Sequence, residues 1–222
     1  QVRLDVVQFK ITHSAALALT VGTVVIGNRG IVEAALTAYG ALSAGAKTAL
    51  TTQKTLLDNL LIQLNALDAA DAAITIAEGS DLQADLDTAS GLMPAVTAGA
   101  AKTALQGRIN VEQGVINANA ASATDALISA LPIVADLVLA DAAQVQAATD
   151  SYDALTADQK LLVLNLATLT AAEDQITALT TATAAVVIAE GTPTQGNVDA
   201  ANALMPAVVA GGAKDALQDR ID

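Results

Sequence analysis

Few residues in this chain could do chemistry, and the first to consider is its single histidine, His13. A Ser–His–Asp relay places the histidine between a nucleophile and an acid, and the adjacent Ser14 does not supply that arrangement. A zinc site would need several histidines or cysteines, and the chain has no cysteine. In a second copy of the same segment, described below, Asp125 stands in the place of His13. We therefore predict a plain surface or partly buried histidine.

Carboxylates are the next candidates for a site. Asp150, Asp153 and Asp158 lie close together in sequence and could offer several oxygens to calcium. Their spacing is not that of an EF-hand, and the matching region of the first copy has no acids, so a solvated helix face is the favoured interpretation. Glu78 and Glu190 could act as a catalytic pair, but they belong to different copies, and we predict a structural role at helix ends.

The remaining candidates also have structural explanations. Gly79 and Gly191 are single glycines and form no phosphate loop. Tyr39 and Tyr152 could stack on a ligand, but each lies among Val and Leu at helical spacing, which favours equivalent buried core sites. In a core, truncation of Tyr152 to Ala would cost about 3–5 kcal/mol. We predict no catalytic, cofactor or metal residues and no enzyme activity.

Charge and composition limit the partners. The net charge of −13 argues against nucleic acid and against an anionic membrane surface. It leaves room for a weak, collective calcium dependence between neighbouring chains. The chain is 53% hydrophobic but holds only two Tyr, one Phe and no Trp, so small aliphatic side chains must fill its core. Such side chains let helices approach closely.

An internal duplication sets the architecture. Ile76-Ala77-Glu78-Gly79 returns as Ile188-Ala189-Glu190-Gly191, and Leu92-Met93-Pro94-Ala95-Val96 returns as Leu204-Met205-Pro206-Ala207-Val208, both 112 positions later. A duplicated unit of this size is typical of repeat proteins. We predict an all-α fold of two similar helical-bundle units of the three-helix type, comprising residues 1–110 and 111–222.

Local signals place the helices of the second copy. Asp141 is a predicted N-cap, with Asn28 in its place in the first copy, and Thr156 with Gln159 matches a capping box. Apolar residues at spacings of 3 and 4 predict a long helix from Leu166 to Val186, ended by Gly191 in the C-cap role. The first copy has Gly45 and Ala46 in place of Asp158 and Gln159, so we expect a less stable turn there.

The two units are expected to be joined by a helix. It would run from Ala101 to about Ile116 or Ala121, with no Gly/Ser linker, which predicts a semi-rigid rod. The N-terminal segment from Arg3 resembles the segment from Arg108, so the chain is expected to begin inside the kind of helix on which it ends. Strand content should be negligible, with 21–26 as the strongest strand candidate.

The stretch from Ile11 to Ile26 is apolar and could be mistaken for part of a signal peptide or for a membrane span. It is short for a membrane span and is interrupted by Thr12, His13 and Ser14. Its counterpart lies inside the chain and contains Pro132, so we predict a connection between helices, with no targeting segment and no membrane span. Gln1 in place of Met suggests a processed or excised fragment.

Two segments of the second copy carry a resemblance. Tyr152-Asp153-Ala154-Leu155-Thr156-Ala157-Asp158-Gln159-Lys160 is similar to the "YDALT-x-x-QK-x-LV" repeats of S-layer and other large cell-surface proteins of Gram-positive bacteria. The segment from Leu204 to Ile221 resembles the second signature of those repeats, "LP-x-G-x-x-K-x-AL-x-x-RL". The resemblance implies tandem three-helix bundles outside the cell that act as spacers, lattice modules or adhesive stalks.

These observations give two function classes. The first is a structural or spacer segment of a bacterial S-layer or cell-surface protein, whose partners are neighbouring repeats, copies of the same protein or cell-wall polymer. The second is a helical module of a larger secreted protein that binds a glycan, cell-wall polymer or host protein. An exposed cluster of aromatic or basic residues would favour the second, and the chain's ten Lys and Arg are widely spread. Both classes place the chain outside the cell, at the bacterial cell surface or in the cell wall.

Overall fold

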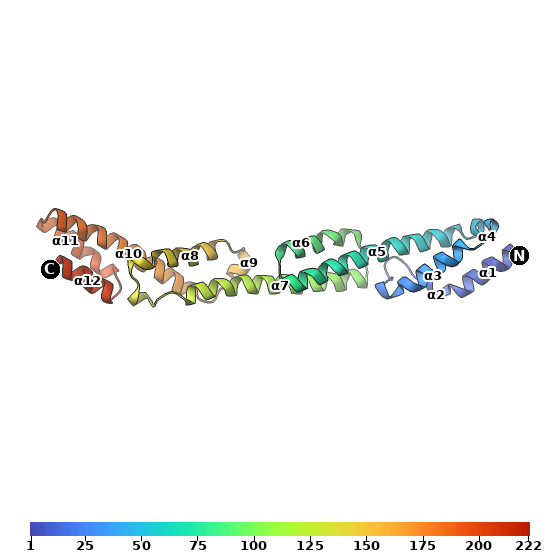
Figure 1. The fold of residues 1–222 in the computed structure, drawn as a ribbon, viewed down its shortest axis with the longest axis horizontal. Coiled ribbons are helices and arrows are strands. Elements are labelled where there is room, and N and C mark those ends of the chain that lie inside the picture. Colours follow the sequence, from blue (N-terminus) through green and yellow to red (C-terminus); the bar gives the residue numbers. More distant parts are fainter. The chain divides into compact units, whose positions relative to one another are not determined.

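The structure, a computed structural model, describes residues 1–222 and contains helices only, which confirms the all-α fold class (Figure 1). The residues fall into two compact units, Gln1–Ile116 and Asn117–Asp222. The boundary lies inside helix α7 (Ala100–Ser129), a few residues after the predicted division at 110/111. This helix is longer than expected, because Gly114, Asn117 and Asn119 do not interrupt it.

The first unit is built from two groups of three helices that share one long helix. Its elements are α1 (Val2–Thr12), α2 (Ser14–Leu17), η1 (Ile26–Asn28), α3 (Arg29–Gly40), α4 (Ala44–Ala49), α5 (Thr51–Ser80), α6 (Gln83–Leu92), η2 (Met93–Ala95) and the first part of α7. The first part of α5 packs with α2 and α3, and its second part packs with α6 and α7 (Figure 1). One continuous core, which includes Leu57, Leu64 and Ile74 of α5, runs through both groups.

The second unit repeats this plan. It contains the rest of α7, η3 (Val134–Asp136), η4 (Leu139–Asp141), α8 (Ala142–Asp153), α9 (Ala157–Lys160), α10 (Leu166–Gly191), α11 (Gln195–Leu204), η5 (Met205–Ala207) and α12 (Gly212–Ile221). Here the core is divided. One cluster joins Ile128 to Leu169 and Ala172, and a separate cluster joins Leu179 to Met205 and Leu217. Each unit is therefore a pair of three-helix groups, rather than the single three-helix bundle that the sequence suggested.

Helix starts follow the predicted caps in part. Thr156 and Gln159 form the capping box, with Gln159 N–H donating to Thr156 Oγ1 at 3.3 Å and Thr156 N–H donating to Gln159 Oε1 at 2.9 Å. In the first unit Ser43 keeps the cap by accepting from Ala46 N–H, and α4 has six residues against four in α9. The loss of the glutamine therefore does not shorten this helix.

Asp141 and Asn28 occupy the N-cap positions of α8 and α3, as predicted, but their side chains do not make the capping bond. Neither side chain accepts from the helix that follows it. Each instead closes the preceding 3₁₀ turn, because Val138 N–H donates to Asp141 Oδ2 at 2.9 Å and Val25 N–H donates to Asn28 Oδ1 at 3.0 Å. The side chain of an Asn or Asp can accept a hydrogen bond from a backbone N–H that lies before or after it in the chain. Here it accepts from the N–H at the start of the preceding 3₁₀ turn.

The helices α5 and α10 end at Ser80 and Gly191, where the sequence predicts, but glycine does not take the C-cap role. Gly79 and Gly191 are helical residues, and no glycine lies in the left-handed region. Asp81, with a φ of 53°, is the left-handed residue at the end of α5, and Thr192, which follows α10, has a φ of −142°. Asp tolerates the left-handed region better than most residues.

The N-terminal segment is helical over more of its length than predicted. Residues from Ile11 to Leu17, except His13, belong to α1 and α2, and only the part after Leu17 forms the connection, without a strand. The buried pair Phe9 and Ala16 matches Ala121 and Ile128, which are also buried and lie 112 positions later. Arg3 is therefore not the counterpart of Arg108, since the burial pattern places that segment two helical turns further along the helix.

Helix α5 is the one helix long and apolar enough, by length and composition, to cross a membrane. A buried core helix gives the same signal. Leu57, Leu60 and Leu64 of α5 are fully buried against the rest of the unit, and Asp58 and Asp68 lie on its outer face in ion pairs with Lys54 and Arg29. These contacts explain the apolar composition of α5 by its place at the centre of two helix groups.

Candidate functional site

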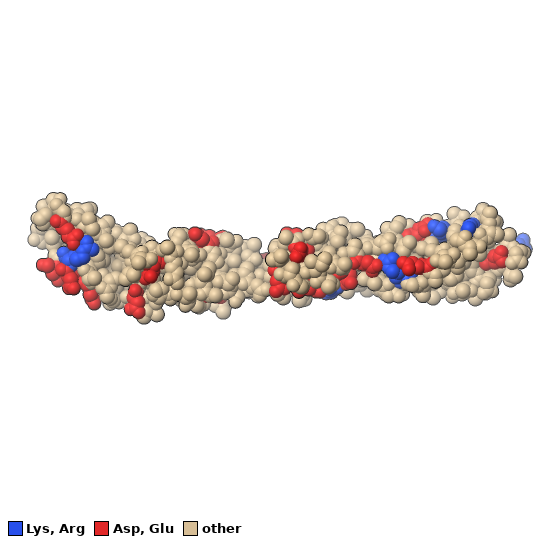
Figure 2. All heavy atoms as spheres, in the orientation of Figure 1, with Lys and Arg blue, Asp and Glu red and all other residues tan.

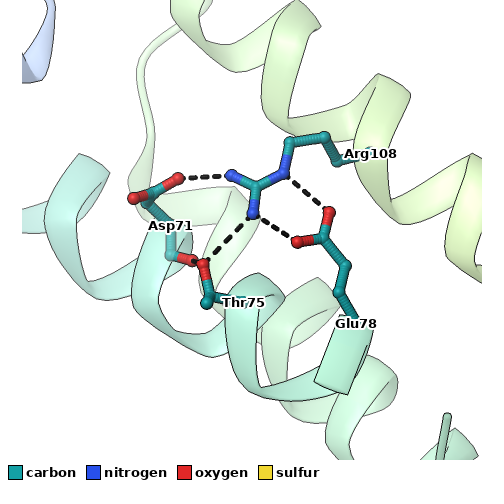
Figure 3. Close-up of polar contacts among 4 residues, drawn as sticks. All are labelled: Asp71, Thr75, Glu78 and Arg108. Carbon is teal, nitrogen blue, oxygen red and sulfur yellow. Dashed lines mark hydrogen bonds and ion pairs between the residues drawn. The ribbon is translucent and has the colours of Figure 1, made fainter. Parts of the chain in front are cut away.

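One cluster of charged side chains in the first unit is centred on Arg108 of α7 (Figure 3). Its Nε and Nη2 atoms donate to the two carboxylate oxygens of Glu78 at 2.8 and 2.7 Å. Nη1 donates to Asp71, and Nη2 also donates to Thr75 Oγ1 at 3.2 Å. The three partners lie on successive turns of α5, so a single guanidinium ties α7 to α5 over two turns.

Electrostatics follow from this geometry. The hydrogen bonds from the Arg108 guanidinium lower the pKa of Glu78, and the two carboxylates raise the pKa of Arg108. A two-pronged Arg–carboxylate contact is among the stronger polar contacts in proteins. All of its donors point at residues of the same unit, so the cluster serves as a brace between helices.

The second unit contains the same brace in reduced form. Arg220 of α12 donates from Nε and Nη2 to the Glu190 oxygens at 2.8 and 2.9 Å, and it likewise lowers the pKa of Glu190. Thr183 stands where the first unit has Asp71, so no second carboxylate joins. The structure thus gives Glu78 and Glu190 the role of ion-pair partners near helix ends, each within its own unit.

A further polar tie occurs only in the first unit. Arg29 at the start of α3 donates to Glu33 at 3.0 Å, to Asn65 at 3.0 Å and to Asp68. The residue in its place in the second unit is Ala142. The first unit therefore has one arginine-centred contact that the second unit lacks.

His13 lies between α1 and α2 and is half-buried. Its ring lies 4.9 Å from the ring of Phe9, and its backbone N–H donates to Phe9 O. Around it, Asp5, Gln8, Thr12 and Leu42 line a shallow hollow of about 230 Å³. The adjacent Ser14 begins α2, and the contacts of His13 are those of a packing residue.

The three aspartates around Tyr152 are exposed, and their carboxylates are not placed to bind one metal ion together. Asp150 accepts from Gln146 at 2.8 Å, and Asp153 lies 4.0 Å from Lys160 Nζ. No group of three or more His, Asp or Glu side chains in the structure is placed to hold a metal. On the face drawn in Figure 2 the acidic side chains are scattered over both units.

The two tyrosines are half-buried, so the prediction of buried sites was wrong in degree. Tyr39 packs on the first core and donates its hydroxyl to Lys47 O at 3.1 Å. Tyr152 packs on the second-unit core, with Lys160 Nζ 5.0 Å from its ring centre. Both rings lie at the rim of a helix group, where one edge stays in contact with water.

Several structural residues escaped the sequence analysis. Gln63 and Gln175 are 4% and 1% exposed, and each accepts one loop N–H, from Thr97 at 3.0 Å and from Val209 at 2.9 Å. Asp125, the counterpart of His13, accepts from Leu164 N–H and Asn165 N–H at 3.0 Å each. The signal for the glutamines was present, because both copies hold Gln at the same core position.

The loop held by Asp125 presents the most exposed large apolar side chains of the chain. Leu161 and Leu164 are 84% and 86% exposed. The first unit has Thr48 and Thr51 at the matching positions, so this apolar loop belongs to the second unit alone.

Comparisons with known proteins add no assignment. No family model matches the chain, and no curated protein and no solved structure matches it either.

Proposed function

We propose that the chain is a structural or spacer segment of a bacterial S-layer or related cell-surface protein. It acts outside the cell through length and through lateral contacts with neighbouring repeats or copies, without catalysis and without a cofactor. The sequence resemblance given above supports this assignment, and so does the repeated architecture.

The observation that carries the proposal is the duplicated brace. In each unit an ion pair joins the long helix to the helix that ends the repeat, Arg108 with Glu78 in the first and Arg220 with Glu190 in the second. In each unit a buried glutamine, Gln63 or Gln175, also binds the corresponding loop. What the duplication preserves is thus a set of contacts within the fold. A repeat maintained for catalysis or ligand binding would be expected to preserve polar groups that point outward.

The first test is location. Antibodies raised against the chain should label intact cells of the source bacterium as strongly as permeabilised cells. Labelling that requires permeabilisation would contradict the proposal. As a control, an antibody against a cytoplasmic protein should label permeabilised cells alone.

The second test is lateral association. Sedimentation velocity at rising concentration should show weak self-association that calcium increases, because divalent ions screen the repulsion between chains of net charge −13. The melting temperature should stay nearly unchanged in calcium. A tight, stoichiometric calcium site would overturn this account of the role of charge.

A binding module is the second candidate, and one observation favours it. Leu161 and Leu164 extend from a loop that Asp125 holds in place, and apolar side chains exposed in this way are typical of protein contacts. If a host protein binds there, the double substitution Leu161→Ser/Leu164→Ser should abolish adhesion of the source bacterium to host cells. Under the structural proposal the same change leaves adhesion and surface labelling intact.

A further inference from the structure

Glu112 of α7 is the one buried carboxyl group that no cation neutralises. Only 5% of its surface is exposed, and its Oε1 atom is buried with no hydrogen-bond partner. The nearest cation on its own helix is Arg108, one turn earlier, which is already occupied by Asp71 and Glu78. A buried ionised carboxylate in this position would be costly.

The partner of Glu112 is another carboxyl group. Its side chain lies within hydrogen-bonding reach of Asp81, the left-handed residue that ends α5. Asp81 is fixed there, because its N–H donates to Ala77 O at 2.9 Å. Two carboxyl groups can hydrogen bond to each other only when one of them carries a proton.

The surroundings of the pair are acidic or neutral. From α5, Glu78 adds a further negative charge, and burial, Asp81 and Glu78 together raise the pKa of Glu112. From α6, Asp85 accepts from Ser80 at 2.6 Å, and Gln83 forms two hydrogen bonds with Gln113, the neighbour of Glu112. No third carboxylate completes a metal site, so a proton is the cation that suits the pair.

We propose that Glu112 and Asp81 share one proton and act as an acid-dependent latch between α7 and the turn that joins α5 to α6. Protonation closes the latch and fixes this corner of the first unit. Loss of the proton leaves two adjacent negative charges, one of them buried, and opens it. The second unit has Pro193 where the first has Asp81, so the latch belongs to the first unit.

The sign of the pH effect follows from linkage. The pKa of Glu112 is higher in the folded than in the unfolded chain, so the folded chain binds more protons in the interval between the two values. The contribution of the latch to stability is therefore complete below the ordinary glutamate pKa. It is lost as the pH rises through the raised value.

The test compares the full chain with Glu112→Gln in thermal unfolding from pH 4 to 8. A neutral amide donates to Asp81 at every pH, so the variant should melt at least about 2–4 °C above the parent at pH 8, the shift that about 1 kcal/mol produces in a chain of this size. The difference should vanish near pH 4. Asp199→Asn removes one exposed carboxylate of the second unit and should show no such dependence.

A carbon-detected NMR titration of the Glu112 carboxyl group gives a readout that does not depend on stability. In the parent, Glu112 should titrate at a higher pH than ordinary glutamates. Asp81→Asn keeps a residue that tolerates the left-handed backbone and should move the Glu112 titration to lower pH. An ordinary Glu112 titration in the parent, or an unchanged one in Asp81→Asn, would overturn the latch.

A calcium titration distinguishes a shared proton from a bound metal ion at the Glu112 and Asp81 pair. Millimolar calcium at pH 8 should leave the parent and Glu112→Gln equally shifted in melting temperature. A calcium-dependent rise in the parent that Glu112→Gln lacks would show that the pair holds a metal ion, and the proposal would fail.

Discussion

The Oε1 atom of Gln63, inside the core of the first unit, accepts a hydrogen bond from the backbone N–H of Thr97 at 3.0 Å. The same bond joins Gln175 to Val209 in the second unit. In both units a buried side chain of the long helix thus anchors the loop that follows the Met-Pro-Ala turn. A buried N–H without a partner is expensive, so these glutamines fix where the loop runs.

Gln63→Leu keeps a similar volume but leaves the Thr97 N–H without a partner. We expect a loss of about 1–3 kcal/mol in the free energy of unfolding. Chemical denaturation followed by circular dichroism measures it. Gln106→Leu, on the exposed face of α7, is the control and should change stability little. Equal effects of the two substitutions would show that the loop bond contributes nothing.

Gly99 and Gly211 permit a close backbone approach. A Cβ atom on Gly99 would lie 2.1 Å from Gly22 O, and one on Gly211 would lie 2.0 Å from Ala135 O. Either substitution to Ala should destabilise the chain by about 1–3 kcal/mol or more, because backbone must shift. Gly107→Ala, in open space within α7, should instead stabilise by about 0.5–1 kcal/mol. A neutral Gly99→Ala would mean that the two loops do not approach so closely.

Acid should weaken the two braces. Arg108 and Arg220 lower the pKa values of Glu78 and Glu190, so each pair contributes stability above the ordinary glutamate pKa and loses it as the pH falls through the lowered value. Glu190→Gln should therefore lower the melting temperature at pH 7, and the difference from the parent should shrink toward pH 2. The effect has the opposite sign to that of Glu112→Gln, which is expected to melt above the parent as the pH rises. A difference independent of pH would show that the ion pair does not stabilise the fold.

The two tyrosine hydroxyls should differ in their contribution. Tyr39→Phe removes the hydrogen bond to Lys47 O and should cost about 0.5–1.5 kcal/mol. Tyr152→Phe removes a hydroxyl without a protein partner and should cost less. Tyr152→Ala should fall below the roughly 3–5 kcal/mol of a core aromatic, because the ring is half-buried. Urea denaturation of the three variants measures these losses in the free energy of unfolding. A loss in Tyr152→Ala as large as that of a core aromatic would instead support the prediction that the ring is buried.

Periodic features were the ones the sequence could predict. The predicted 3 and 4 spacing marks the buried face of α10 from Leu169 to Val186, whereas Leu166 is exposed. The Thr156 and Gln159 box starts α9 at the expected residue. Both signals are local, and a helix start or an apolar face depends on residues within one or two turns.

Features that depend on contacts between helices were missed or misplaced. The Arg108 brace joins residues 30 and 37 positions apart in the sequence, and the Gln63 bond joins residues 34 apart. Asn28 and Asp141 could cap on either side, and only the 3₁₀ turn before them decides which. The sequence does not distinguish Glu112 from the other acidic residues, because its burial arises from the way α7 lies against the end of α5.

The division of the second-unit core has a consequence for how the chain opens. In the first unit one continuous core links both helix groups, so loss of packing in one group is felt in the other. In the second unit the cluster around Leu179 and Met205 is separate from the cluster around Ile128 and Leu169. Its last group, α11 and α12 on the end of α10, shares no buried apolar cluster with the rest of the unit, so we expect it to unfold locally first. Amides there should exchange with solvent long before those of α5, whose protection should approach that of global unfolding.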